Sequence, residues 1–363
     1  MIRLCLTLVA LLTAGCTTGF GPKFVRSERP DYNEHIIRSS DTEMLLNLIR
    51  LRYNDSPLFL ELGTVVASYT HDAEFTAGAS ISDDAAGTLG GSLALGEHPT
   101  VTYTPLTGEE FATRMLTPIP IDAIMLFEKG GWRADRLLLV TVQQFNDILN
   151  APTASGPTPE HPPDYEAFAD FAAEMERLRS AELMGFSWEK NEQDAKSRVG
   201  TSHFWLREST SDPAHQEDLD AVRRALGLGH ERHDFDLTPY PHARTETQVG
   251  IRCRSVLGIM EFLSKAVEVP PPHSEAGLVT VTRDSNGEPF DWSRVTGRIM
   301  RIHSQEDEPD NAYVSIRHRG WWFYIRDDDQ SSKATFNLLN LLYSLQSANG
   351  KGKSPFLTLQ IGE

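Results

Sequence analysis

Apolar and polar positions alternate with a period of two along residues 58–103. Apolar or small residues occupy every second position of 75–81 and again of 89–95, and Thr, Ser and Gly stand between them. Residues 83–87, Asp-Asp-Ala-Ala-Gly, separate the two stretches. Alternation interrupted by a Gly/Asp turn is typical of two antiparallel strands. The pattern predicts a long β-hairpin with one apolar face.

This hairpin admits two interpretations. It either lies on the core of its own domain, or it is one of several hairpins that identical subunits donate to a shared membrane-spanning sheet. A membrane strand needs about 9–11 alternating residues, and both arms are that long. Against a membrane strand, the aromatic residues are few (Tyr69 and Tyr103), and Glu74 and His98 interrupt the alternation. We favour the first interpretation, because the periodic signal of a membrane strand is weak.

Apolar residues three and four apart predict helices over much of the remaining chain. Asp41 is placed to cap the first helix, Asp327–Asp329 to begin the last one, and Arg319-Gly320 to form a tight turn between two strands. The run 137–142 fits a buried strand or a helix. Helices are expected at 42–52, 121–127, 165–184, 213–226, 255–267 and 333–346, and strands at 202–206, 249–253, 299–303, 312–318, 321–325 and 356–361. We expect an α+β fold with mixed helices and a mainly antiparallel sheet.

Proline and glycine mark the expected boundaries between regions. Residues 16–40 are expected to form a tether, because they are rich in Gly, Pro and mixed charges. Residues 151–164 contain five prolines and are expected to form a linker. They separate an N-terminal α+β region, 41–150, from a C-terminal α+β region, 165–363.

The first fifteen residues have the layout of a secretory signal. Arg3 precedes an apolar run from Leu4 to Leu12, and Thr13-Ala14-Gly15 leads to Cys16. The run is too short to span a bilayer, which needs about 20 residues. The segment resembles the lipobox of bacterial lipoproteins. The resemblance implies cleavage after residue 15, acylation of Cys16 with palmitate-like chains, and, with Thr17 next, an outer-membrane location facing the periplasm.

Charge and cysteine content narrow the possible partners. The chain has 363 residues and a net charge of −17, and removal of residues 1–15 takes away one further positive charge. Such an acidic surface repels phosphate backbones, so a nucleic-acid partner is not expected. The three cysteines are Cys5, Cys16 and Cys253. With Cys5 in the signal and Cys16 acylated, Cys253 is expected to be a buried thiol without a disulfide partner.

Two clusters are candidates for chemistry. His230 and His233 could share a helical face as metal ligands, although a solvated polar loop is the ordinary interpretation and a metal is not expected. Trp321 and Trp322, beside Arg317 and Arg319, could form an aromatic and cationic surface for a glycan or a protein of the envelope. Neighbours on a strand face opposite sides, so one Trp must point away from the core. The sequence contains no phosphate-binding loop, nucleophile elbow or Cys-x-x-Cys pair, and no cofactor is expected.

Three segments, Asn47–Tyr53, Gly320–Ile325 and Ser332–Phe336, are similar to a set of uncharacterised predicted lipoproteins of Gram-negative bacteria. The resemblance implies no activity and no catalytic residue. Our leading hypothesis is a lipid-anchored, non-enzymatic protein that binds or scaffolds another envelope component at the outer membrane. The alternatives are a homo-oligomeric export or secretion lipoprotein that inserts the 58–103 hairpin into the membrane, and an envelope hydrolase with dispersed catalytic residues that include His230 or His233.

Overall fold

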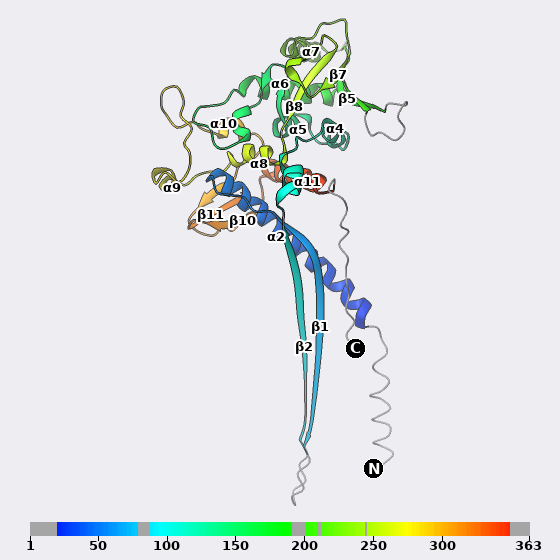
Figure 1. Cartoon of the computed structure of the whole chain (residues 1–363), viewed down its shortest axis with the longest axis vertical. Helices are drawn as coiled ribbons and strands as arrows, with labels where there is room; N and C mark the ends of the chain where they lie inside the picture. Colours follow the sequence, from blue (N-terminus) through cyan, green and yellow to red (C-terminus); the bar gives the residue numbers. More distant parts are fainter. Residues whose placement is uncertain (1–19, 79–87, 191–199, 209–211, 244, 349–363) are drawn as a thin grey trace, which may run out of the picture.

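A computed structural model of the chain describes residues 20–78, 88–190, 200–208, 212–243 and 245–348. These residues form a body of helices and two sheets, from which a two-stranded hairpin extends (Figure 1). Most neighbouring strands are antiparallel, and helices and strands alternate irregularly along the chain. The expected α+β class is therefore confirmed.

Helix α2, Phe20–Arg52, begins far earlier than expected. Residues 20–40, which were expected to form a tether, are helical, and Asp41 lies inside the helix instead of capping it. The Asp41 carboxylate accepts hydrogen bonds from Asn340 Nδ2 at 2.8 Å and from the Tyr313 hydroxyl at 3.3 Å. Residues such as Leu45 and Leu48 are fully buried in the body. That packing supplies the costly nucleus from which a helix extends outward with little further cost.

The expected hairpin consists of β1, Leu60–Gly78, and β2, Thr88–Pro105. The strands pair in antiparallel register from Leu60 opposite Pro105 to Gly78 opposite Thr88. In the described part of the chain this sheet contains no third strand. The hairpin projects from the body instead of lying on its core (Figure 1), so the interpretation favoured from the sequence is wrong on this point.

Short helices and strands connect the hairpin to the rest of the body. The expected helix at 121–127 is present, and the run 137–142 is helical up to Thr141. In chain order the elements are α3 Gly108–Phe111, a π-helical turn Ala112–Leu116, α4 Ile121–Lys129, α5 Ala134–Thr141, β3 Val142–Phe145 and β4 Ile148–Leu149.

A six-stranded sheet joins the two regions that the proline-rich segment was expected to separate. Its order is β4-β3-β8-β7-β6-β5, and only β7 and β8 run parallel. Because β3 precedes the segment and β8 follows it, the two regions share one sheet and one hydrophobic core. The elements of this part are α6 Glu166–Ser180, β5 Met184–Lys190, β6 Gly200–Leu206, α7 Pro213–Leu226, β7 Asp234–Thr238 and β8 Gln248–Cys253.

A three-stranded sheet of order β10-β11-β9 packs near the base of the hairpin (Figure 1). Arg319 and Gly320 have φ angles of 49° and 89° and form the expected tight turn. Asp329 accepts a hydrogen bond from the Ser332 amide at 3.0 Å, as a cap of the last helix does. The strand expected at 356–361 lies outside the described residues. The elements are α8 Val256–Ser264, α9 Pro271–Glu275, α10 Ser293–Thr296, β9 His303–Gln305, β10 Ala312–His318, β11 Trp321–Arg326 and α11 Gln330–Ala348.

Three buried cations hold the proline-rich segment against the body. Arg254 Nε donates to Ser155 Oγ at 2.8 Å, and Lys265 Nζ donates to the carbonyl of Gly156 at 3.1 Å. From α2, Arg52 Nη1 donates to Thr158 Oγ1 at 3.2 Å. Backbone carbonyls of a segment without regular structure need such donors once they leave water. Residues 151–164 are thus a packed part of the body.

Candidate functional site

The register of the hairpin separates apolar from polar positions. Residues directly opposite in an antiparallel pair share a face, and successive residues alternate between the two faces. Apolar or small positions pair on one face as Ala73–Leu93, Phe75–Gly91 and Ala77–Leu89, and the other face carries Asp72–Ala94, Glu74–Ser92 and Thr76–Gly90. Glu74 and His98, which seemed to interrupt the alternation, both lie on the second face, since His98 pairs with Ser68. The first face is therefore continuous from Ala73 to Ala77.

The character of the first face changes nearer the body. His71 lies opposite Leu95, and Tyr69 lies opposite Glu97. At this height of the hairpin the first face therefore includes a histidine, a tyrosine and a glutamate. Beyond them toward the turn, the positions of the same face are apolar or glycine. A strand of 19 residues such as β1 is about 60 Å long, which is roughly twice the thickness of a bilayer's hydrocarbon core.

Charged contacts fix the base of the hairpin to the body. The Leu60 amide donates to the Glu43 carboxylate of α2 at 2.8 Å. Arg114, whose side chain is only 10% exposed, forms ion pairs with Glu61 of β1 and with Glu110. These contacts orient the first residues of β1. Figure 1 shows that the hairpin leaves the body in the same direction as the Phe20 end of α2 and extends farther than that end.

The predicted lipidation site, Cys16, lies outside the described residues. In the sequence it precedes Phe20, the start of α2, by four residues. Whatever is attached at Cys16 is therefore close in sequence to the end of α2 that points the same way as the hairpin.

The predicted aromatic and cationic surface is divided between two faces of the three-stranded sheet. Trp322 pairs with Arg317 on β10 and with Gln305 on β9, and it lies on the face opposite the buried Phe323. Both Trp321 and Trp322 are half-buried, and Arg317 is exposed. The prediction that the two Trp side chains face opposite sides is confirmed, and only Trp322 and Arg317 contribute to the outer face.

Trp321 and Arg319 belong to a separate cluster near the C-terminal end of α2. Arg319 Nη2 forms an ion pair with Asp55 at 2.9 Å, and its guanidinium lies 5.3 Å from the ring centre of Tyr53. Trp321 packs edge-on against His273 at a centroid distance of 6.1 Å. Burial, followed by the nearby Arg319 charge, lowers the pKa of His318 in this cluster. The cluster joins the sheet to α2 and covers part of Trp321, which is half-buried.

His230 and His233 lie on an exposed loop after α7. Arg223 organises this loop by donating to the carbonyls of Gly229 at 2.5 Å and Arg232 at 3.0 Å, and its Nη2 lies 3.3 Å from His233 Nδ1. Within the described ranges, no group of three or more His, Cys, Asp or Glu side chains is arranged to hold a metal ion. The two histidines therefore remain without a third ligand there.

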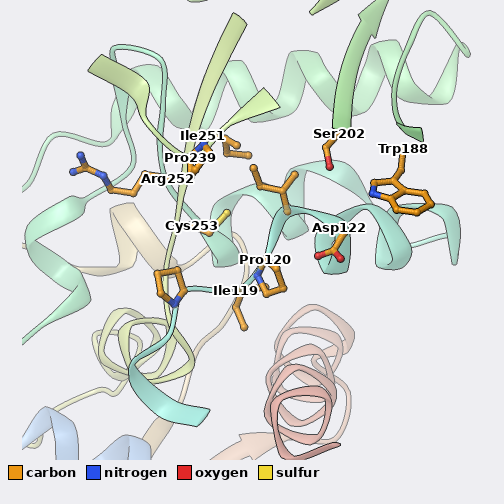
Figure 2. Close-up of a pocket in the computed structure, with 11 residues that line it drawn as sticks. Ile119, Pro120, Asp122, Trp188, Ser202, Pro239, Ile251, Arg252 and Cys253 are labelled. Atoms are coloured by element: carbon orange, nitrogen blue, oxygen red, sulfur yellow. The ribbon is translucent and has the colours of Figure 1, made fainter. Parts of the chain in front are cut away.

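A cavity of about 400 Å³ lies between the start of α4 and the edge of the six-stranded sheet (Figure 2). Its polar lining residues include Asp122, Ser202 and Arg252, and Arg252 points away from Asp122 in Figure 2. Cys253 also lines it, and burial raises the pKa of that thiol to about 12. A thiol with this pKa stays protonated and is a poor nucleophile, so the cavity does not carry a cysteine-based active site.

The sequence analysis missed two features of the hairpin, which are the contacts that hold its base to the body and the register of its strands. No local pattern marks Glu43 or Arg114 as partners of β1, because the pairs are far apart in the chain. The register was partly accessible, since Glu74 and His98 are 24 positions apart, and this even separation places both on one face in the register that the strands adopt.

Every helix in the described part of the chain is too short or too polar to cross a bilayer. No family model, no curated protein sequence and no solved structure matches this chain.

Proposed function

We propose that this protein is a lipid-anchored, non-enzymatic component of the outer membrane whose β1–β2 hairpin enters the bilayer and pairs with the hairpins of identical subunits. The observation that supports this most directly is the hairpin itself. It is a long ribbon with an apolar and a polar face, it has no third strand within the described residues, and it projects from the body.

The physical argument begins with the stability of the ribbon. A lone two-stranded hairpin is marginally stable in water at best, and each of its outer edges presents unpaired N–H and C=O groups. An apolar face along its outer half adds surface that water disfavours. A bilayer on that face and a neighbouring strand on each edge remove both difficulties together.

The identity of the neighbour follows from the same edges. In lipid, every backbone polar group must find a partner, so one hairpin cannot enter the hydrocarbon alone. The β1 edge of one copy and the β2 edge of the next are complementary, and repetition around a closed ring satisfies every edge. The membrane segment would begin near the level of His71 and Glu97, beyond which the first face is apolar.

Adjacent single-cysteine variants provide a matched test. Ala77→Cys and Thr76→Cys place an environment-sensitive dye on opposite faces at the same height of the hairpin. In vesicles, we expect the dye at position 77 to be quenched by lipid-borne quenchers and the dye at position 76 to be quenched by aqueous iodide. Cys253 is only 8% exposed, so it provides little background labelling.

A hairpin-deletion variant tests the assembly. Replacing residues 64–102 with a short Gly-rich turn should convert a detergent-extracted oligomer into a monomer, as measured by light scattering. Equal access of iodide to both labelled positions in membranes, or a full-length protein that stays monomeric in detergent, contradicts the proposal. A Cys16→Ala variant separates the effect of lipid anchoring from the effect of hairpin insertion, because it removes the lipid anchor and leaves the hairpin intact.

A further inference from the structure

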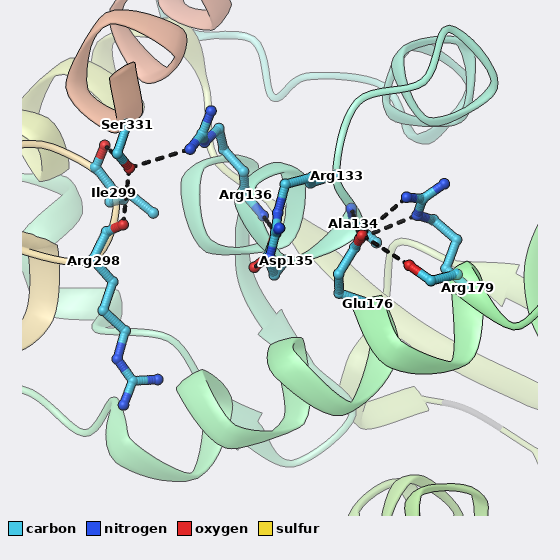
Figure 3. Close-up of polar contacts among 10 residues, drawn as sticks. Arg133, Ala134, Asp135, Arg136, Glu176, Arg179, Arg298, Ile299 and Ser331 are labelled. Atoms are coloured by element: carbon cyan, nitrogen blue, oxygen red, sulfur yellow. Dashed lines mark hydrogen bonds and ion pairs between the residues drawn. The ribbon is translucent and has the colours of Figure 1, made fainter. Parts of the chain in front are cut away.

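A second cavity, of about 300 Å³, lies between α5, α6 and the start of α11. Arg133, Arg136 and Arg298 line it together with Asp135 and Ser331 (Figure 3). The lining thus carries three positive charges and one negative charge, in a chain whose net charge is −17. A local excess of positive charge in an acidic protein favours an anionic ligand.

The carboxylates around this cavity are already engaged. Asp135 accepts hydrogen bonds from Arg133 Nε at 3.0 Å and Nη2 at 2.7 Å. Burial alone would raise the pKa of Asp135, but the hydrogen bonds and charge of Arg133, together with the amide and charge of Arg136, lower it. Glu176 accepts from the Ala134 amide and from Arg179. These pairings neutralise Arg133 and Arg179 and leave Arg136 and Arg298 without a carboxylate of their own among the described residues.

Arg136 is the best-positioned donor. Its Nη2 donates to Ser331 Oγ at 3.2 Å, which fixes the guanidinium beside the start of α11 (Figure 3). Its Nε is buried and has no hydrogen-bond partner within the described ranges. Burial lowers the pKa of Arg136, which means that the surroundings disfavour its charge. A bound anion would supply the missing acceptor for Nε and would add to the negative charges of Asp135 and Asp329, which favour the charged form of Arg136 but do not offset its burial.

The remaining surface of the cavity is apolar. Leu139 comes from α5, and Ala169 and Ala173 come from α6. Arg298 extends from the loop after α10 toward α6, on the other side of the cavity from the Arg136 guanidinium (Figure 3). The geometry suits a ligand that has an anionic group and a short apolar portion.

We propose that this cavity binds a small organic dianion, with one anionic group at Arg136, the other at Arg298 on the opposite side of the cavity, and its apolar portion against Leu139, Ala169 and Ala173. The cavity lies in the part of the body that is remote from the hairpin and from the Phe20 end of α2 (Figure 1). A freely diffusing anion therefore fits it better than a headgroup of the membrane that the hairpin would enter. This inference does not depend on the proposed function of the hairpin.

Titration calorimetry with succinate and with inorganic phosphate, at fixed ionic strength, tests the site. Arg298→Gln removes an exposed guanidinium that has no partner in the described residues, so the body should fold normally. Arg136→Gln removes the central donor. We expect each variant to weaken succinate binding by about tenfold or more, since hydrogen bonds to charged groups contribute that much. Succinate that binds more tightly than phosphate indicates that the apolar portion contributes.

Arg224→Gln is the matched control, because Arg224 is an exposed arginine of α7 outside this cavity. It lowers the net charge by the same amount and should change the affinity by less than about twofold. The proposal is overturned if neither anion binds saturably below about 10 mM, or if all three variants weaken binding equally. Thermal melting of each variant separates a loss of binding from a loss of fold.

Discussion

The hairpin and the proline-rich segment contrast in how composition relates to packing. The hairpin has regular alternation and ideal pairing, yet it projects from the body and, in the described part of the chain, pairs only with itself. Residues 151–164 have five prolines and little regular structure, yet Ala151 and Ala154 are fully buried. Regular strand pairing alone therefore does not place a segment in the core of this molecule, and a lack of regular structure does not exclude a segment from it.

The difference arises from how each region satisfies its backbone. Ladder hydrogen bonds between β1 and β2 satisfy half of the backbone groups of the hairpin, and the outer edges remain open. The proline-rich segment has no ladder, so buried side chains donate to it: Lys265 donates to the backbone carbonyl of Gly156, and Arg254 donates to the hydroxyl of Ser155. The hairpin thus needs a partner outside the monomer, whereas the segment already has its partners within it.

The largest expected effect comes from removing Arg254. Its guanidinium is fully buried and donates to the carbonyls of Leu139, Val140, Val142 and Asn150 as well as to Ser155. Arg254→Met leaves several buried carbonyls without donors, so we expect the free energy of unfolding to fall by on the order of 4 kcal/mol. Urea denaturation followed by circular dichroism measures the change.

Arg252→Met is the control for that experiment. Arg252 lies two residues earlier, in β8, and it is exposed. Its loss should change the free energy of unfolding by less than about 0.5 kcal/mol. Similar changes for both variants would mean that the buried hydrogen bonds do not hold the segment.

The second-largest expected effect is a change in the free energy of unfolding with pH in the alkaline range. Burial lowers the pKa of Lys265 from 10.5 to about 8, although Glu261 partly opposes the shift. Between these values the Lys265 side chain binds more protons in the unfolded chain than in the folded protein, so this residue makes stability rise with pH from about 8 toward 10.5. Above pH 9 the Cys253 thiol opposes the rise, because it ionises in the unfolded chain while its raised pKa of about 12 keeps it protonated in the folded protein. We expect the contribution of Lys265 to the free energy of unfolding to rise by on the order of 3 kcal/mol over this range.

Lys265→Met should abolish most of this rise, because methionine does not titrate. Below pH 8 the lysine is protonated in both states and contributes no slope. Chemical denaturation at several pH values from 7 to 10 measures the slope for both proteins. A wild-type protein whose stability stays constant or falls over this range contradicts the assignment of a buried ammonium group to Lys265.

The smallest expected effect is on the body when the hairpin is removed. The contacts of the hairpin with the body lie at its base, around Leu60 and Glu61. Replacing residues 64–102 with a short turn should therefore change the free energy of unfolding of the body by no more than about 0.5 kcal/mol, as for a surface substitution. Urea denaturation measures this change. A large loss of stability would show that the hairpin packs on the body in solution.

Much of the fold was accessible from the sequence because local patterns determine it. Alternation predicted β1 and β2, apolar spacing predicted α7 at 213–226, and the Arg319-Gly320 dipeptide predicted its turn. The early start of α2 was missed, because Pro22 and Pro30 were taken as signs of a tether. Proline removes one hydrogen bond and disfavours a helix interior, but it does not exclude a helix that is nucleated by packing elsewhere.

The candidate site was predictable only in part. That Trp321 and Trp322 face opposite sides follows from strand geometry, but which of them faces the core does not. Arg136 and Arg298 come from distant parts of the chain, and no spacing rule brings them to one cavity.

The sequence by itself determined the two strands of the hairpin, helices such as α4, α6, α7 and α8, the α+β class, the turn between β10 and β11 and the acidic charge, because each depends on residues that are close along the chain. Only the tertiary structure decided that the hairpin projects, that the proline-rich segment is buried and that three arginines surround one cavity. These features depend on contacts between residues more than a hundred positions apart in some cases, such as Arg254 with Asn150. Local periodicity carries no information about such pairs, because burial is a property of the whole folded chain.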